Sequence, residues 1–357
     1  MLASIASARS SIELETYIFA DDPTGWRFLQ ALVQAAKHGV RVRVLADSYG
    51  SLMLSDDFFR PLVQAGGKVK FFNPLRFHRF GVRDHRKLLV CDGQTAFTGG
   101  GNIADEYDGD GITRGWFDLM LKIDDPSAAA RLVQEFDTMF ATADFRRRPL
   151  PRFRAFRPLR RPSEGAKILA IKPGRGLSNF QRVLLSDLTG AVNADFIVPY
   201  FLPNRRLRRK FRQIVRRGGR VRVIVPALCD VPFARAAGMI YYGRLLRAGV
   251  EIYEYQPQIL HAKLFVIDGN VFAGSSNLDV RSLKLNHELM LRFTDDASVQ
   301  NAKDIFSLAL RHCRRIELKE FRRSLNFWQR WKNHWAHFLV ARIDPLVALR
   351  QYAALEK

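Results

Sequence analysis

The sequence HRKLLVCD at residues 85–92 recurs as HAKLFVID at residues 261–268. In each copy a Lys stands two residues after the His, and an Asp stands five residues after the Lys. A small-residue turn that ends in Asn follows each copy, GGGN at 99–102 and GSSN at 274–277. Two copies of one pattern in a single chain predict an internal duplication built around one functional site.

The apolar residues within each copy, 88–90 and 264–267, are typical of a buried strand. Because side chains alternate between the two faces of a strand, the His and the Lys of each copy point to the same side. Glycines in the following turns allow close backbone approach, and the Asn adds amide donors. Two such strands side by side would gather six polar side chains around one point: His85, Lys87, Asn102, His261, Lys263 and Asn277. Imidazoles, ammonium groups and amides in this number suit a phosphodiester.

The acidic residue of each motif occupies a different place. Asp92 and Asp268 come seven residues after their His, an odd number, so they lie on the opposite face of the strand. Although both belong to the candidate catalytic motif, we expect them to support it structurally and not to carry protons.

The paired motif resembles the HKD signature of the phospholipase D superfamily. Three further stretches are similar to bacterial cardiolipin synthases, namely YIF at 17–19, NIADEY at 102–107 and NLDVRSLKLNHE at 277–288. The similarity runs from about residue 12 to about residue 293. The resemblance implies an α/β fold in which two similar α/β/α domains form a pseudo-twofold, bilobal unit with a shared central site, a monomer that is internally a pseudo-dimer.

The resemblance also implies a mechanism. Asp118 and Glu288 occupy the places at which family members hydrogen-bond the catalytic imidazoles. His85 is expected to attack phosphorus and form a phosphohistidine, while His261 serves as general acid and then as general base. The motif lysines and both Asn residues would neutralise the phosphoryl oxygens, so no cofactor and no metal are expected.

Hydrophobic periodicity predicts the same order of elements in both parts of the chain, strand, helix, strand, helix and strand, each time before the motif. The predicted strands lie at 12–19, 40–44, 68–72 and 116–124 and again at 195–200, 221–225 and 250–255. The predicted helices lie at 26–37, 56–64, 128–139, 204–217 and 234–248. Since family members usually carry a strand before the first helix, we expect the first sheet to be one strand short.

This pattern divides the chain into four parts. They are a first phospholipase D-like domain at 1–145, an Arg/Pro-rich linker at 146–163, a second such domain at 164–318 and a basic, aromatic tail at 319–357. The linker is either a solvated connector or a further contact for anionic lipid or nucleic acid.

The tail has helical spacing of its apolar residues: Phe321, Leu325, Trp328, Trp331, Trp335 and Phe338. Arg and Lys residues flank them, and Pro345 is expected to end the helix. A basic, aromatic amphipathic helix favours a membrane interface; the alternative is that its apolar stripe packs against the core of the protein.

Composition indicates which kinds of molecule the protein binds and in which compartment it works. The 357 residues include 57 Lys and Arg against 35 Asp and Glu, a net charge of +22, which favours anionic partners. Three scattered cysteines argue against a disulfide framework and a thiolate zinc site, and they favour a reducing compartment. No apolar run is long enough to span a membrane and no signal peptide is evident. We therefore expect a peripheral protein on the cytoplasmic face of the membrane that binds anionic phospholipid, with nucleic acid as the less favoured partner.

Four functions fit these features. The first is a phosphatidyltransferase resembling cardiolipin synthase, which joins two phosphatidylglycerols and releases glycerol. A phospholipase D hydrolase differs only in admitting water as acceptor, and a nuclease of the same superfamily fits the positive charge. A catalytically inactive binder of anionic surfaces ranks last, because no motif residue is missing.

The second motif departs from the first in length. Asn102 is the tenth residue after Asp92, whereas Asn277 is the ninth residue after Asp268. If the hairpin turn absorbs the missing residue, Asn277 keeps its place; if not, the second half of the site is displaced.

Overall fold

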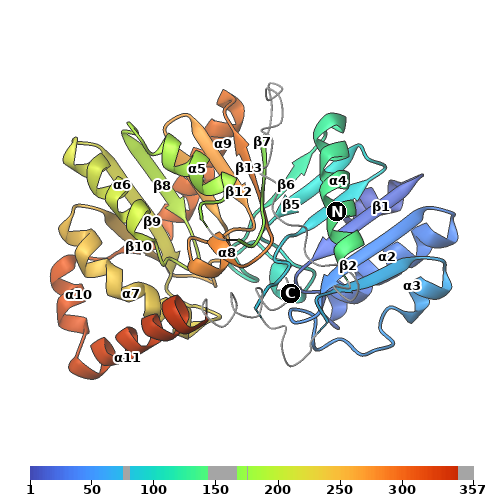
Figure 1. Cartoon of the computed structure of the whole chain (residues 1–357), viewed down its shortest axis with the longest axis horizontal. Helices are drawn as coiled ribbons and strands as arrows, with labels where there is room; N and C mark the ends of the chain where they lie inside the picture. The colour runs from blue at the N-terminus through green and yellow to red at the C-terminus, as the bar shows by residue number, and fades with distance from the viewer. Residues whose placement is uncertain (75–80, 144–166, 175, 345–357) are drawn as a thin grey trace.

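The computed structural model describes residues 1–74, 81–143, 167–174 and 176–344. Its strands form one sheet of six and one of eight, and the two sheets meet near the middle of an elongated, two-lobed molecule (Figure 1). The expected pair of similar α/β halves is therefore confirmed. Below, the first half means β1–β6 with its helices, and the second half means β7–β14 with its helices.

The first half has the strand order β3-β2-β1-β4-β5-β6, in which β1, β2 and β3 are parallel. Its strands are β1 (Ser11–Thr16), β2 (Arg41–Asp47), β3 (Lys68–Phe72), β4 (Leu88–Cys91), β5 (Thr95–Gly99) and β6 (Met120–Ile123). Its helices are α1 (Leu2–Ser7), α2 (Pro23–Lys37), α3 (Arg60–Gln64) and α4 (Pro126–Thr142), with a 3₁₀ turn, η1, at Asp105–Tyr107.

The second half has the order β14-β10-β9-β8-β11-β12-β13-β7, in which β8, β9 and β10 are parallel. Its strands are β7 (Lys167–Ile171), β8 (Asn193–Ile197), β9 (Arg220–Pro226), β10 (Glu251–Tyr255), β11 (Leu264–Ile267), β12 (Asn270–Gly274), β13 (Glu288–Phe293) and β14 (Cys313–Arg315). Its helices are α5 (Asn179–Asp187), α6 (Arg205–Arg216), α7 (Pro232–Arg247), α8 (Val280–Lys284), α9 (Asp296–Arg311), α10 (Leu318–Ser324) and α11 (Phe327–Phe338), followed by a π-helical turn, η2, at Leu339–Ile343.

The motif strands are buried on both faces, as their continuous apolar runs predict. On β4, Leu89 and Cys91 join the core under α2, while Leu88 and Val90 join the core under α4. On β11, Phe265 and Ile267 join the core under α6, while Leu264 and Val266 join the core under α9. Helices on both faces of each sheet therefore fix which way the alternating side chains point.

The cores under α4 and α9 also join the two halves. Leu289 and Leu291 of β13 pack into the core under α4, and Phe117 packs into the core under α9. The apolar contact between the sheets is thus continuous with the interior of each half, which holds the two motif strands in a fixed relation.

Several predicted boundaries shift. The second helix begins at Arg60 and not at residue 56, and the strand predicted at 116–124 is regular only from Met120. The tail does not form one helix, because the chain breaks between α10 and α11. The predicted linker at 146–163 and Pro345 lie outside the described residues.

In the described residues the second sheet has two strands without a counterpart in the first, β7 and β14, and the counterpart of β7, the strand before the first helix, is the one that we expected to be missing. In the second half β7 pairs antiparallel with β13 at the sheet edge, whereas in the described part of the first half β6 itself is the edge. None of the described helices combines the length and apolar character that crossing a bilayer requires.

The two motif hairpins explain the difference in motif length. Cys91 pairs with Thr95 across a three-residue turn, whereas Ile267 pairs with Asn270 across a two-residue turn. Both turns begin with an Asp whose φ is positive, 56° at Asp92 and 48° at Asp268. The turn therefore accounts for the missing residue, and in both halves the Asn is the third residue after the end of the strand.

Candidate active site

Backbone hydrogen bonds tie each motif His to the opposite half of the molecule. The amide of His85 donates to the carbonyl of His287 at 2.9 Å, and the amide of His261 donates to the carbonyl of Phe117 at 2.8 Å. Two short parallel bridges, Asp84 with His287 and Phe117 with Leu260, complete the seam. The two motif strands thus end at the same boundary and face each other across it.

The carboxylate that serves His85 comes from the other half. Glu288, the first residue of β13, places Oε2 3.0 Å from Nδ1 of His85, although 203 residues separate them. The hydroxyl of Ser275 also donates to Glu288 Oε2 at 2.5 Å. Burial raises the pKa of Glu288 to about 7, despite the nearby Lys87 and these hydrogen bonds.

The second His–carboxylate pair is equivalent to the first, with the two halves exchanged. Asp118 of the first half places Oδ2 2.6 Å from Nδ1 of His261. Burial favours a higher pKa for Asp118, but the charges of Lys263 and His261 outweigh it and hold the pKa below its ordinary value. Gly100 makes room for this carboxylate, because a Cβ there would lie 2.2 Å from Asp118 Oδ1.

The motif lysines are buried beside the imidazoles. Lys87 donates to the carbonyl of His85 at 2.8 Å, and Lys263 donates to the carbonyl of His261 at 2.5 Å. Burial lowers the pKa of Lys87 to about 7 and that of Lys263 to about 8. A bound phosphodiester would counteract this loss, since an anion favours the ammonium form.

Burial also lowers the pKa of both imidazoles. For His85 the neighbouring charges of Lys87, Lys263 and His261 add to the effect, so its pKa falls well below the ordinary value. For His261, burial and Lys263 lower the pKa more than Asp118 raises it. The neutral form, which is the nucleophilic form of an imidazole, is therefore favoured at His85, whereas at His261 the carboxylate of Asp118 opposes the shift.

The two Asn residues lie at equivalent places but have different partners. Asn102 accepts a hydrogen bond from the amide of Ile18 at 3.0 Å and donates to the hydroxyl of Tyr107 at 2.7 Å. Asn277 is buried, and its Oδ1 finds no hydrogen-bond partner among the described residues. The side chain of Asn102 is therefore held through both its oxygen and its nitrogen, while Asn277 retains an unused acceptor oxygen among the described residues.

Three aromatic rings line the site that sequence reasoning did not identify as functional. Tyr17 lies with its ring centroid 5.0 Å from that of His85 and under the ammonium of Lys87 at 5.2 Å. Tyr107 and Trp116 each lie 5.5 Å from the ring of His261. Tyr17 and Tyr107 fall within the stretches that carry the family resemblance, but neither has a motif spacing that marks it as part of a site.

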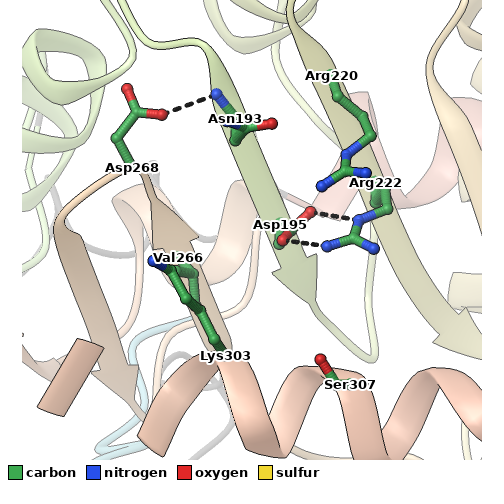
Figure 2. A pocket seen from close by; sticks show the side chains of 8 residues that line it. All are labelled: Asn193, Asp195, Arg220, Arg222, Val266, Asp268, Lys303 and Ser307. Atoms are coloured by element: carbon green, nitrogen blue, oxygen red, sulfur yellow. Dashed lines mark hydrogen bonds and ion pairs between the residues drawn. The ribbon is translucent and has the colours of Figure 1, made fainter. Parts of the chain in front are cut away.

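The motif aspartates lie in the turns that follow their strands, and not on the opposite strand face that the odd spacing predicted. Asp92 accepts hydrogen bonds from the amides of Arg9, Ser10 and Ser11, which fixes the start of β1. Asp268 accepts from the amide of Asn193 at 2.8 Å in the corresponding place before β8 (Figure 2). These contacts support a structural role for both carboxylates.

The pocket in Figure 2 is distinct from the site of the imidazoles. Asp268 lines it together with Asp195, Arg222 and Lys303, and Asp195 binds the guanidinium of Arg222 through two hydrogen bonds of 2.7 and 2.6 Å. No motif His or Lys lines this pocket.

Comparison with known proteins gives consistent results. The family model described as "Cardiolipin synthase, PLD-like domain" matches residues 1–140 and 187–309. Cardiolipin synthase 1 of Bacillus cereus is 31% identical over 337 residues, covering 90% of this chain and 66% of its own length. Cardiolipin synthase B of Salmonella typhi is 32% identical over 324 residues, covering 88% of this chain and 78% of its own length. The chain thus spans just under two thirds of the Bacillus cereus relative.

Among solved structures, phosphatidylserine synthase of Haemophilus influenzae superposes with a TM-score of 0.72 at 15% identity, covering 98% of this chain and 92% of its own. Polyphosphate kinase of Porphyromonas gingivalis superposes with a TM-score of 0.60 at 16% identity, covering 89% of this chain and 46% of its own. At such identities the likeness concerns the fold alone.

Proposed function

This chain belongs to the cardiolipin synthase family of phospholipase D-like proteins, and from that membership we propose that it is a phosphatidyltransferase. The reaction we propose transfers a phosphatidyl group from one phosphatidylglycerol to the hydroxyl of a second, through a phosphohistidine, with release of glycerol. The observation that carries the proposal is the crossed pairing of the two imidazoles with carboxylates of the opposite half, His85 with Glu288 and His261 with Asp118.

The crossed pairing leaves Nε2 of each ring outside the contact with the carboxylate, and Nε2 of His261 lies 3.0 Å from the ammonium of Lys263. Since Nδ1 of His85 faces Glu288, its Nε2 is the atom that attacks phosphorus. A P–N bond forms, the bond from phosphorus to the glycerol oxygen breaks, and Nε2 of His261 gives its proton to that oxygen. Asp118 stabilises the imidazolium form of His261 that this step requires.

The second step reverses the first with a new alcohol. Neutral His261 takes the proton of the incoming hydroxyl, whose oxygen attacks phosphorus while the P–N bond to His85 breaks. Cardiolipin leaves and both imidazoles return to their starting states, so atoms and protons balance over the cycle.

Charge neutralisation falls to the groups between the two rings. The anionic phosphodiester favours the ammonium forms of Lys87 and Lys263, which take their protons from solvent and offset the negative charge that grows on its oxygens. In this proposal the amide NH2 of Asn277, a buried residue that follows the buried Ser275 and Ser276, donates to one of those oxygens.

We also infer that the protein works as a peripheral protein on the cytoplasmic face of a membrane. Its phospholipid substrates reside in a bilayer, and the net charge of +22 favours an anionic lipid surface over a neutral one. Both halves of the site lie in one chain, so the proposed active unit is a monomer with an internal pseudo-dimer.

The test is turnover of phosphatidylglycerol vesicles by the purified protein, followed by mass spectrometry. We expect cardiolipin and glycerol from the wild type and from His38→Ala, which removes an exposed His from the end of α2, and neither product from His85→Ala. Phosphatidic acid in place of cardiolipin would make water the acceptor and the protein a phospholipase. Turnover of single-stranded DNA with no turnover of lipid would replace the proposal by a nuclease.

A further inference from the structure

The helix α11 carries a continuous row of exposed aromatic side chains. Its exposed large apolar residues are Phe327 (72% exposed), Trp328 (71%), Trp331 (52%), Trp335 (48%) and Phe338 (48%), and the row continues into η2 with Leu339 and Ile343. Neighbouring rings in the row lie 5.7–6.4 Å apart, so the row runs unbroken along the helix. A row of this length is unusual on a surface that meets only water.

The opposite face of α11 is firmly attached to the second half. Asn333 and Ala336 are buried, and Ala336 packs with Ala236 and Ala237 of α7. The hydroxyl of Tyr241 on α7 pairs with Nε2 of His337 at 2.6 Å. The apolar residues of the tail are therefore not equivalent. Phe321 of α10 is buried against Tyr242, while the Trp residues of α11 face outward.

The chain after α11 leads to the boundary that holds the imidazoles. Val340 packs beside Tyr200 and Leu202, at the carboxyl end of β8. Asp344 then forms an ion pair of 2.5 Å with Arg281 of α8, whose guanidinium also donates to the carbonyl of Gly81. Arg281 stands four residues after Asn277, and Gly81 stands four before His85, so the segment after the aromatic row is anchored to both half-sites. In Figure 1, α11 runs along the lower edge of the second half toward the middle of the molecule.

The charge of this segment has one sign. From Phe321 to Ile343 the sequence contains no Asp or Glu, but it contains Arg322, Arg323, Arg330, Lys332 and Arg342. Indole rings beside basic side chains, without acidic ones, are complementary to the interface of an anionic bilayer, where the rings lie at the depth of the headgroups and the cations meet the phosphates.

We propose that the aromatic face of α11 is a docking surface for an anionic phospholipid bilayer, and that it holds the boundary between the two halves, where the imidazoles lie, close to that bilayer. The inference deepens the proposed function and rests on it for the identity of the substrate. A lipid could then reach the imidazoles from the membrane surface without leaving it, because the same short segment binds both the bilayer and the rim of the site.

The experiment compares the full-length wild type with Trp328→Ala/Trp331→Ala/Trp335→Ala. The matched control is Trp26→Ala, which removes an exposed Trp (42%) from α2 in the first half. Each protein is sedimented with vesicles of equimolar phosphatidylglycerol and phosphatidylcholine, and with phosphatidylcholine alone. Each is also assayed on monomeric, short-chain phosphatidylglycerol, which needs no bilayer.

We expect the triple variant to lose about tenfold or more of its partition onto the anionic vesicles, while the control keeps it. Wild-type binding to phosphatidylcholine alone should be much weaker. The triple variant should turn over the short-chain substrate at the wild-type rate, because none of its changes touches the site. Brominated acyl chains should quench the Trp emission of the wild type but not that of the triple variant.

Equal vesicle binding by the triple variant and the wild type would overturn the proposal. So would a triple variant that binds vesicles normally but sediments as a smaller species than the wild type, since the aromatic face would then join two copies of the chain. Vesicle binding is read from sedimentation and not from product formation, so a failure of the proposed chemistry shows in the short-chain assay and is distinguishable from a failure of the docking surface.

Discussion

Asn102 donates a hydrogen bond of 2.7 Å to the hydroxyl of Tyr107, whereas its equivalent in the second half, Asn277, buries an oxygen with no partner in the described chain. One sequence position thus has a structural duty in the first half that it lacks in the second.

The two Asn residues should therefore respond differently to the same substitution. Asn277→Ala should lower kcat by about a hundredfold through loss of a donor to the phosphoryl group, at little expense of stability. Asn102→Ala should lower kcat and also destabilise the fold by about 1–2 kcal/mol, because the amide of Ile18 loses its acceptor. Thermal unfolding beside single-turnover rates separates the two effects; equal destabilisation by both variants would contradict this division.

The assignment of nucleophile and acid can be tested with a better leaving group. A phosphatidyl ester of p-nitrophenol needs no protonation of the departing oxygen, so His261→Ala should still release p-nitrophenolate once and accumulate a phosphohistidine. His85→Ala should release none. Intact-protein mass spectrometry detects the adduct, and an adduct that survives in His85→Ala but not in His261→Ala would reverse the roles.

The lysines predict an alkaline limit to activity. The pKa of Lys87 is lowered to about 7 and that of Lys263 to about 8, and only the ammonium form neutralises phosphate. The value of kcat/KM, which reports the free enzyme, should fall as pH rises through this range. Lys87→Arg keeps its charge, so the limb should move toward pH 8 even where the absolute rate drops. Lys68→Arg, an exposed change on β3, should leave the pH profile unaltered.

Glu288 predicts a conflict between stability and activity. Its pKa in the folded protein is raised to about 7 from an ordinary 4.5. Such a group contributes stability fully below its unfolded pKa and loses it as pH rises through the folded pKa, a change of about 3 kcal/mol. Glu288→Gln cannot ionise, so its melting temperature should fall less between pH 5 and 8 than that of the wild type. Its turnover should nevertheless drop by about a hundredfold or more, because His85 loses its orienting carboxylate.

The pKa of Asp118 is shifted in the opposite direction to that of Glu288, so its effect on stability has the opposite dependence on pH. Its pKa is held below the ordinary value, so its ionised form stabilises the protein above the unfolded pKa and this stability is lost as pH falls. Asp118→Asn should therefore be less stable than the wild type at pH 7 and approach it in acid. Parallel pH series of melting temperatures for Asp118→Asn and Glu288→Gln, with trends of the same sign, would refute this reading of the site.

The motif aspartates should matter for stability and not for chemistry. Asp92→Ala should lower the free energy of unfolding by about 1–3 kcal/mol, because three backbone amides lose their acceptor. Asp268→Ala should lower it less, since in the described residues Asp268 accepts hydrogen bonds from two backbone amides, those of Val192 and Asn193. Both should keep near-wild-type kcat on short-chain lipid at a temperature where they are folded; a loss of kcat in either folded variant would return that Asp to the catalytic set.

Much of this architecture follows from sequence periodicity. The two-residue spacing of His85 and Lys87 predicts that both point to one side, and Lys87 does contact the carbonyl of His85. The place of Asp92 comes instead from the hairpin turn after β4. What periodicity does not contain is the contact between strands that are far apart in sequence. The rings of Tyr17, Tyr107 and Trp116 reach the imidazoles only because loops of separate strands converge there.

The tail shows a different kind of failure. The aromatic spacing continues through residues 321–338, but Asn326 caps a new helix and its partner Gln329 closes the capping box. The local hydrogen bonds of a helix start therefore override the longer apolar period. Phe321 then belongs to the core and the Trp residues to the surface, a division that spacing alone does not reveal.

The crossed pairing of imidazoles and carboxylates has a consequence for inheritance. A gene that arises by duplication normally frees one copy to accumulate changes while the other retains the ancestral task. Under the proposed mechanism, a lesion at Glu288 in the second half removes the carboxylate of His85 in the first, and a lesion at Asp118 removes that of His261. Neither repeat can then replace the other, so selection acts on the two repeats together. A change in one repeat at the boundary between them has to be compatible with the residue that it contacts in the other.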